Sequence, residues 1–369
     1  MEPHLIPNLD PNPLPAPFWV FKLLLLVTFL LHILAMNFLL GGSVLALLAK
    51  WLPGDKKHRD HIFGDIAKKL PIFLPATITL GIAPLLFVQV LYGQFFYTSS
   101  AILAWPWFLV LVFLTTAYYG FYYVSFQNAR QPGSAGGVML LSVLLVFSIG
   151  FIYSNNMTLS LTPSRWKAKY FAGPGGWNLN LLEPTLIPRF LHFFTGALAV
   201  AGLLLVFLAY FRSRKDADYG RALFEFGGRA YAYATMAQFM IGLWFLTSLP
   251  HDLLISLLLG KNPLALILLA VGAVGGIAGI LLMSNALHKD NLRMGACVVP
   301  IVTLIVIACM IGLRDILRDA YLKPYFQPGQ FAVQTQWSVL PLFLVLFLAG
   351  VGLWFVMLKR YGLFASPKS

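Results

Sequence analysis

The sequence predicts an all-α, polytopic membrane helix bundle that forms a single integral membrane domain over residues 1–369. Of the 369 residues, 59% are hydrophobic and 11% are charged, and the mean hydropathy is +0.79. A soluble domain has about 25% charged residues. Apolar runs of roughly 20 residues, which is the length that crosses about 30 Å of hydrocarbon, recur along the whole chain. They leave no room for a separate soluble domain.

We expect about nine transmembrane helices, one from each apolar run. The first run follows a proline-rich, acidic stretch without a cleavage site, so it predicts a permanent helix and not a removed signal peptide. The other eight runs are bounded by segments that contain Gly, Pro or charged residues. In chain order, the predicted spans are 18–49, 71–93, 102–127, 137–156, 187–211, 229–249, 263–286, 295–313 and 337–358.

The net charge of +13 orients these helices and does not indicate nucleic-acid binding. Basic residues gather in alternate loops: Lys56 and Lys57 follow the first span, whereas the opposite set of loops holds fewer, among them Arg165 and Lys167. The positive-inside rule then predicts an outside N-terminus and a cytoplasmic C-terminus. We expect a multi-pass protein of a bacterial inner membrane, with the lipid bilayer and no nucleic acid as a partner.

Two histidines, His32 and His192, lie inside apolar spans. An imidazole in hydrocarbon needs a polar or metal partner, so an intramembrane histidine is a candidate functional residue. We interpret both as ligands of haem iron; the alternative is a hydrogen bond to a neighbouring helix. His192 has the stronger surroundings, because Arg189 lies one turn toward the outer surface, where a haem propionate would emerge. Gly196, one turn deeper, would leave space for a porphyrin face.

A second axial ligand for His192 has two candidates. Met240 lies in the sixth span, near its outer side, although a methionine in an apolar helix is usually a gap-filler. His251 closes the same span at the outer surface, and it could instead serve a quinone site or be an ordinary interfacial histidine. All thirteen acidic residues fall in predicted tails, loops or helix ends, so the sequence predicts no intramembrane carboxylate relay of the kind that proton pumps use.

These features resemble subunit I of the cytochrome bd quinol oxidases over about residues 20–250. That family has nine helices, an outside N-terminus and haem-ligating histidines in its first and fifth helices. Locally, the resemblance rests on Leu31-His32-Ile33-Leu34 and Arg189-Phe190-Leu191-His192. It implies that His192 ligates a low-spin b haem near the outer surface. It also implies that His32 ligates a second, deeper haem and that Arg189 takes the family's basic position.

The chain departs from the family at the residues that carry oxygen and quinol chemistry. The third span contains no acidic residue where the family supplies two glutamates, so oxygen reduction is not predicted. The long outer loop that forms the family's quinol site shrinks to about residues 250–262, without its Gly-Arg-Gln-Pro-Trp signature. The family's methionine ligand follows an arginine on helix seven; Arg293-Met294 is similar, but it lies at a predicted cytoplasmic helix start.

The expected function is therefore that of a b-haem membrane electron-transfer subunit, a quinol-linked oxidoreductase component that holds one or two b haems and a quinone. It would pass electrons between the quinone pool and an extracytoplasmic redox partner. The expected partners are other respiratory-complex subunits, including a c-type cytochrome on the outer face. One alternative is a haem-free scaffold or quinone-binding anchor of a respiratory complex. A small-molecule transporter is a further alternative, which the absence of intramembrane charge and inverted repeats disfavours.

Overall fold

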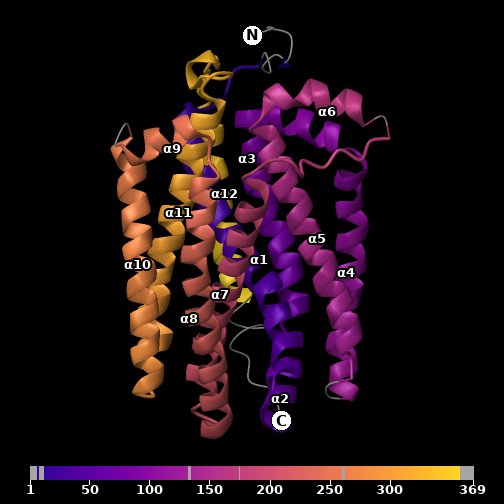
Figure 1. Cartoon of the computed structure of the whole chain (residues 1–369), viewed down its shortest axis with the longest axis vertical. Coiled ribbons are helices and arrows are strands. Elements are labelled where there is room, and N and C mark those ends of the chain that lie inside the picture. Colours follow the sequence, from indigo (N-terminus) through magenta and orange to yellow (C-terminus); the bar gives the residue numbers. More distant parts are fainter. Residues whose placement is uncertain (1–5, 8–11, 132–133, 174, 260–261, 358–369) are drawn as a thin grey trace.

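The computed structural model describes residues 6–7, 12–131, 134–173, 175–259 and 262–357, which are almost entirely helical (Figure 1). Eight long helices form two groups of four, which pack against each other mainly through α1 and α7. The first group comprises α1 (Phe18–Trp51), α3 (Leu70–Leu103), α4 (Trp105–Arg130) and α5 (Gly136–Ser160). The second comprises α7 (Leu186–Arg212), α8 (Ala217–Thr247), α10 (Pro263–His288) and α11 (Val299–Leu322).

The membrane topology agrees with the predicted helix bundle. Eight helical segments are long and apolar enough to cross a membrane, and the count rises to nine if α8 and α9 (His251–Leu258), bent by 119°, form one span. Several boundaries differ from the prediction: α3 continues to Leu103 beyond the expected residue 93, and α8 begins at Ala217 instead of residue 229. The eighth span was expected to end at residue 313, but α11 continues to Leu322. Four charged residues that the sequence places in an outer loop therefore belong to the helix: Arg314, Asp315, Arg318 and Asp319.

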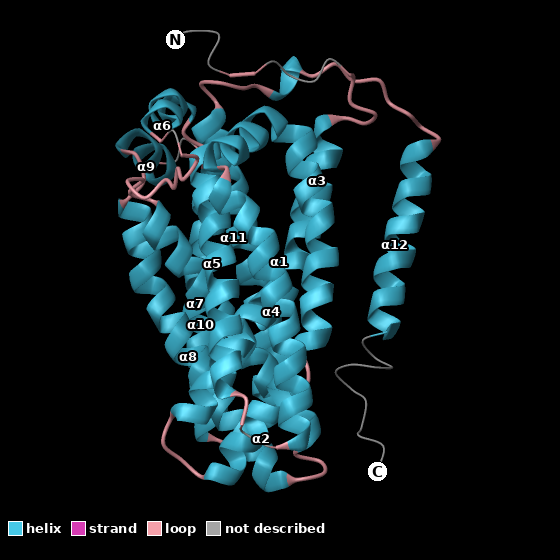
Figure 2. Cartoon of the chain, turned by 90° about the vertical axis from the view of Figure 1, so that its right-hand side faces the viewer, coloured by secondary structure: helices cyan, strands magenta, loops and turns pink. Residues whose placement is uncertain are grey.

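The two ends of the bundle are covered differently. Helices α6 (Trp166–Ala172) and α9 lie across one end, which we call the cap end, and α2 (Lys56–Ala67) lies at the other (Figures 1 and 2). Both α1 and α7 begin at the cap end and run in the same direction. By the predicted orientation, the cap end faces the outside.

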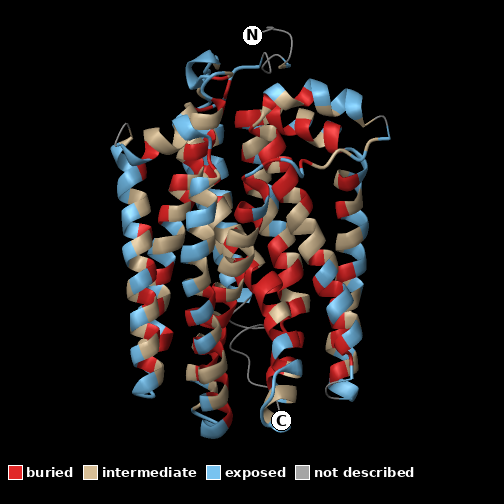
Figure 3. Ribbon diagram, viewed as in Figure 1, coloured by how far each residue is buried: buried red, intermediate tan, exposed pale blue. Residues whose placement is uncertain are grey.

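Small residues bring the helices together in the centre of the bundle. A Cβ atom at Gly41 of α1 would collide with the backbone carbonyl of Ala197 in α7. In α7 and α8, a Cβ at Gly202 would lie 2.6 Å from the carbonyl oxygen of Gly227, and the reverse also holds. Backbones can approach this closely only at glycine. Figure 3 shows the result: buried residues concentrate on the central helices, and exposed ones on the outward sides of α4 and α10.

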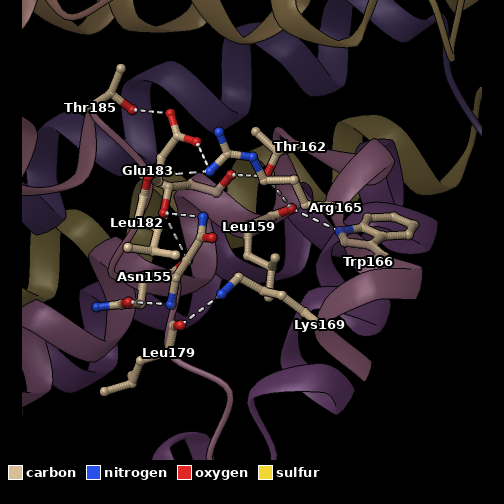
Figure 4. A network of polar contacts seen from close by, with 12 residues as sticks. Asn155, Leu159, Thr162, Arg165, Trp166, Lys169, Leu179, Leu182, Glu183 and Thr185 are labelled. Atoms are coloured by element: carbon tan, nitrogen blue, oxygen red, sulfur yellow. Dashed lines mark hydrogen bonds and ion pairs between the residues drawn. The ribbon is translucent and has the colours of Figure 1, made fainter. Parts of the chain in front are cut away.

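A polar network ties the connection between α5 and α7 to the cap end (Figure 4). The guanidinium of Arg165 lies 2.9 Å from the Glu183 carboxylate, which also accepts a hydrogen bond from Thr185. The Lys169 ammonium donates to the Leu179 carbonyl, and burial, followed by the charge of Arg165, lowers the pKa of Lys169. These contacts hold the segment down over the helix ends.

Helix α12 (Val339–Met357) stands beside the rest of the bundle, and none of its described residues is buried (Figure 2). Its ring contact is between Phe343 and Phe87 of α3, whose centroids are 6.3 Å apart. The segment before it is held by the N-terminal segment, because Leu14 forms a β-bridge with Val333. The position of α12 therefore depends on the surrounding lipid more than on contacts with the other helices.

Candidate functional site

His32 makes a defined hydrogen bond across two helices. Its Nδ1 lies 3.0 Å from the backbone carbonyl oxygen of Thr77 in α3. A carbonyl oxygen can only accept, so Nδ1 carries the proton and Nε2 of the neutral ring keeps its lone pair. Gly81, one turn further along α3, makes room for the ring: a Cβ there would lie 2.9 Å from Nδ1. This is the arrangement in which a metal-binding histidine is oriented by its second nitrogen.

His192 lies in the second turn of α7 and faces α8. The Gln238 side-chain amide donates to the backbone carbonyl of His192 at 2.8 Å, and a Cβ at Gly242 would lie 3.4 Å from the imidazole Cε1. The Nδ1 atom of His192 is buried and has no hydrogen-bond partner in the described part of the chain. A buried ring nitrogen without a partner is costly, which makes His192 a candidate for a ligand contact.

Gly196 does not leave the expected space for a porphyrin face. A Cβ at this position would lie 2.9 Å from Nε2 of Gln238, so the side chain of Gln238 fills the place beside it. The opening that does lie beside the imidazole is at Gly242, on the opposite helix.

Arg189, one turn above His192, is buried and not directed toward water. It is 8% exposed, and its guanidinium lies over the ring of Phe245 at 4.9 Å. Its Nε and Nη2 atoms have no hydrogen-bond partner among the described residues. The sequence predicts a cation on this face; the structure adds that the cation is enclosed.

Two further arginines share a cavity with Arg189. Arg314 and Arg318 of α11 line it from one side and Tyr92 of α3 from another. Its volume of about 30 Å³ has room for one or two water molecules. The site therefore lies where the two helix groups meet, near the cap end.

A group of ion pairs adjoins the cavity. The Lys22 ammonium of α1 lies 2.6 Å from Asp315 and 2.7 Å from Asp319. Asp319 also accepts a hydrogen bond from the Tyr92 hydroxyl at 2.8 Å, and Arg318 approaches Asp315 at 3.4 Å. Asp315 is thus a buried carboxylate inside a membrane-spanning helix, contrary to the expectation that all acids lie in tails, loops or helix ends.

Neither candidate for a second ligand of His192 approaches it. Gln238 and Gly242 both face α7, whereas Met240 lies between them on the opposite face and is 74% exposed. His251 opens α9 beyond the bend, with its side chain 84% exposed. The structure brings together His192 and Arg189, but not Met240 or His251. In the described part of the chain, no three His, Cys, Asp or Glu side chains meet as a metal-ion site.

Sequence reasoning missed the charged cluster that adjoins the cavity beside Arg189. Lys22, Tyr92, Arg314, Asp315, Arg318 and Asp319 come from three helices and meet only in the fold. One signal was present: Arg and Asp each recur at a spacing of four residues within 314–319, which places like residues on one helix face.

The fold is similar to that of a chain in a solved structure. A chain in the structure of the bd oxidase from Geobacillus thermodenitrificans superposes with a TM-score of 0.72 at 13% sequence identity, over 95% of this chain and 100% of that one. The chain therefore has a bd-oxidase-like membrane fold. No protein-family model matches the sequence, and no curated protein matches it.

Proposed function

We propose that the protein is a b-haem electron-transfer subunit of a membrane redox complex, with His192 as a haem ligand. The observation that carries this proposal is the buried Nδ1 of His192, which has no hydrogen-bond partner among the described residues and lies one turn below Arg189, whose Nε and Nη2 likewise have none there. The iron of a haem needs an axial ligand such as a histidine nitrogen, and the haem propionates are stabilised by a nearby cation. The bd-oxidase-like fold supports the same conclusion at the level of architecture.

The residues fit one or two b haems by the chemistry of their donors. His192 supplies a ring nitrogen, and His32 supplies Nε2 while the Thr77 carbonyl fixes its tautomer. Arg189 supplies a charged donor for a carboxylate. When bound, a b haem would supply one-electron transfer. The chain's part is to hold the iron, orient the imidazole of His32 and keep water away with the surrounding helices.

The decisive measurement is a reduced-minus-oxidised optical spectrum of the purified protein. We expect a b-type absorption band. His192→Ala should remove the low-spin signal, whereas His32→Ala should leave that same signal in place. His251→Ala is the matched control, since this histidine is exposed at the cap end and should change nothing. A colourless protein would overturn the proposal.

We further propose that electrons pass between the quinone pool and a redox partner on the outer face, in a bacterial inner membrane. A c-type cytochrome is the partner we favour, docked on the cap end, where Tyr170, Phe171 and Trp177 are exposed. Exposed aromatic side chains are enriched where proteins associate. Reduction of a soluble c-type cytochrome by quinol should occur in proteoliposomes of the purified complex and should slow in Phe171→Ser.

The haem-free scaffold or quinone-binding anchor is supported by a different observation. The cavity beside Arg189 is about 30 Å³, while pockets for small-molecule ligands span roughly 300–1,000 Å³. Haem binding therefore requires neighbouring side chains to repack, and a scaffold does not. A colourless protein that still assembles with respiratory subunits would establish this second function. Substrate uptake by proteoliposomes without any redox cofactor would instead establish a transporter.

A further inference from the structure

The cavity between the two helix groups is lined by cationic side chains to an unusual degree. Arg189, Arg314 and Arg318 all border it, together with Tyr92 and Ser160. Arg189 and Arg318 are only 8% and 9% exposed. Arginine is rarely buried without a partner, and inside a membrane-spanning bundle it marks a functional site.

Aromatic rings fix the orientation of the three guanidinium groups. Arg189 lies over Phe245 at 4.9 Å, Arg314 over Phe29 at 4.6 Å, and Arg318 over Tyr92 at 4.9 Å. A ring interacts with the cation but accepts few of its five N–H bonds. Nε and Nη2 of Arg189 have no hydrogen-bond partner among the described residues, and Nη1 of Arg318 makes no hydrogen bond there but lies 3.4 Å from the Asp315 carboxylate. The rings thus hold the arginines in place and leave donors unused.

The carboxylates in contact with this cluster do not balance its charge. Lys22 and the three arginines are four cations, while Asp315 and Asp319 supply two anions. Glu183 is also near Arg189, but Arg165 already pairs with it at 2.9 Å. An excess of two positive charges in a low-dielectric region is costly unless an anion compensates it.

We propose that the arginine cavity, which at about 30 Å³ has room for one or two water molecules, widens to bind an anion with two negative charges, of the carboxylate or phosphate class. Guanidinium groups bind such anions through paired N–H donors, and three of them on two helices can surround one ligand. The Tyr92 and Ser160 side chains add polar groups to the lining. The bound anion links α7 to α11 at the place where the two helix groups meet.

The negative charges have two sources. One is the pair of propionates of a haem on His192, one turn below Arg189; this source rests on the proposed function. The other is a free dianion such as inorganic phosphate, and this source does not rest on the proposed function. The optical spectrum of the preparation decides which arm of the experiment applies.

In a haem-free preparation, the test is thermal unfolding of the purified full chain with inorganic phosphate, against chloride at equal ionic strength. Phosphate should raise the wild-type midpoint by about 2–4 °C or more. Ser160→Asp places a carboxylate in the cavity lining, so this variant should unfold at a higher midpoint than Ser160→Asn and lose the phosphate response. Arg318→Gln should also lose the response. The control Arg229→Gln, at an exposed position of α8 paired with Glu225, should keep it.

In a haem-bearing preparation, phosphate should have no effect, because the propionates fill the site. Arg318→Gln should then shift the midpoint potential of the haem and speed its loss in detergent, while Arg229→Gln leaves both unchanged. Two results overturn the inference. One is a haem-free chain that phosphate does not stabilise, or in which Ser160→Asp is no more stable than Ser160→Asn. The other is a haem-bearing chain in which Arg318→Gln changes neither the midpoint potential of the haem nor the rate of its loss in detergent. A colourless protein that binds phosphate overturns only the proposed function.

Discussion

The imidazole Nδ1 of His32 lies 3.0 Å from the carbonyl oxygen of Thr77, and this contact assigns the proton of the ring. It leaves Nε2 as the atom with a lone pair. A histidine whose only role was to join α1 to α3 would be satisfied by this bond. The same bond also prepares the ring for a metal, so the role of His32 must be tested by moving the ring rather than by removing it alone.

Gly81→Ala should displace the imidazole of His32. The added Cβ would lie 2.9 Å from both Nδ1 and Cε1, so the ring must shift away from Thr77. We expect a loss of stability of about 1–3 kcal/mol and, if His32 binds haem, a change in that haem's absorption. Gly137→Ala is the control, because nothing lies within 4 Å of a Cβ there. Equal unfolding midpoints and spectra for the two variants would contradict the prediction.

Asp315→Asn should be strongly destabilising. The carboxylate is buried between Lys22 and Arg318, and its removal leaves Arg318 without its counter-charge and Lys22 with Asp319 alone. Breaking a buried ion pair costs about 3–5 kcal/mol. Chemical unfolding in detergent measures the change. Asp290→Asn removes an exposed pair with Arg221 at the opposite end of the bundle and should cost about 0–1 kcal/mol. Similar losses for both variants would refute the special role of Asp315.

Gly41→Ala should weaken the contact between the two helix groups. Its Cβ would collide with the Ala197 carbonyl, which forces α1 away from α7. Overpacking of this kind costs about 1–3 kcal/mol, and the thermal midpoint should fall accordingly. Gly350→Ala in α12, where nothing lies within 4 Å, should be neutral or slightly stabilising. A neutral Gly41→Ala would show that the groups are joined elsewhere.

Met240→Ala should leave any haem spectrum unchanged. The side chain points away from His192 and is 74% exposed, so it cannot reach the iron without rotation of α8. The spectrum of the variant should overlay that of the wild type. Loss of the low-spin band in Met240→Ala would mean that α8 turns when the haem binds.

Hydrophobic periodicity and length were enough to predict the helix bundle, because each span had to satisfy its own backbone in lipid. They failed at the end of α11, where charged residues resemble a loop. Lys22 neutralises Asp315 from 293 positions away in the chain, and a local pattern does not contain such a partner. The same reason explains why Met240 was a candidate ligand on sequence grounds. The face of α8 that meets α7 carries Gln238 and Gly242, which contact His192, and Met240 lies on the other face.

Helix α12 has a different kind of freedom from the rest of the chain. Its 19 residues extend about 28 Å, and none of them is buried against the bundle. Its sequence is therefore constrained by the lipid around it rather than by neighbouring side chains. Saturation mutagenesis should find that α12 tolerates almost any exchange among apolar residues, while charged replacements impair membrane insertion. Such a helix can diverge rapidly between related proteins without disturbing the arginines and histidines that the bundle encloses.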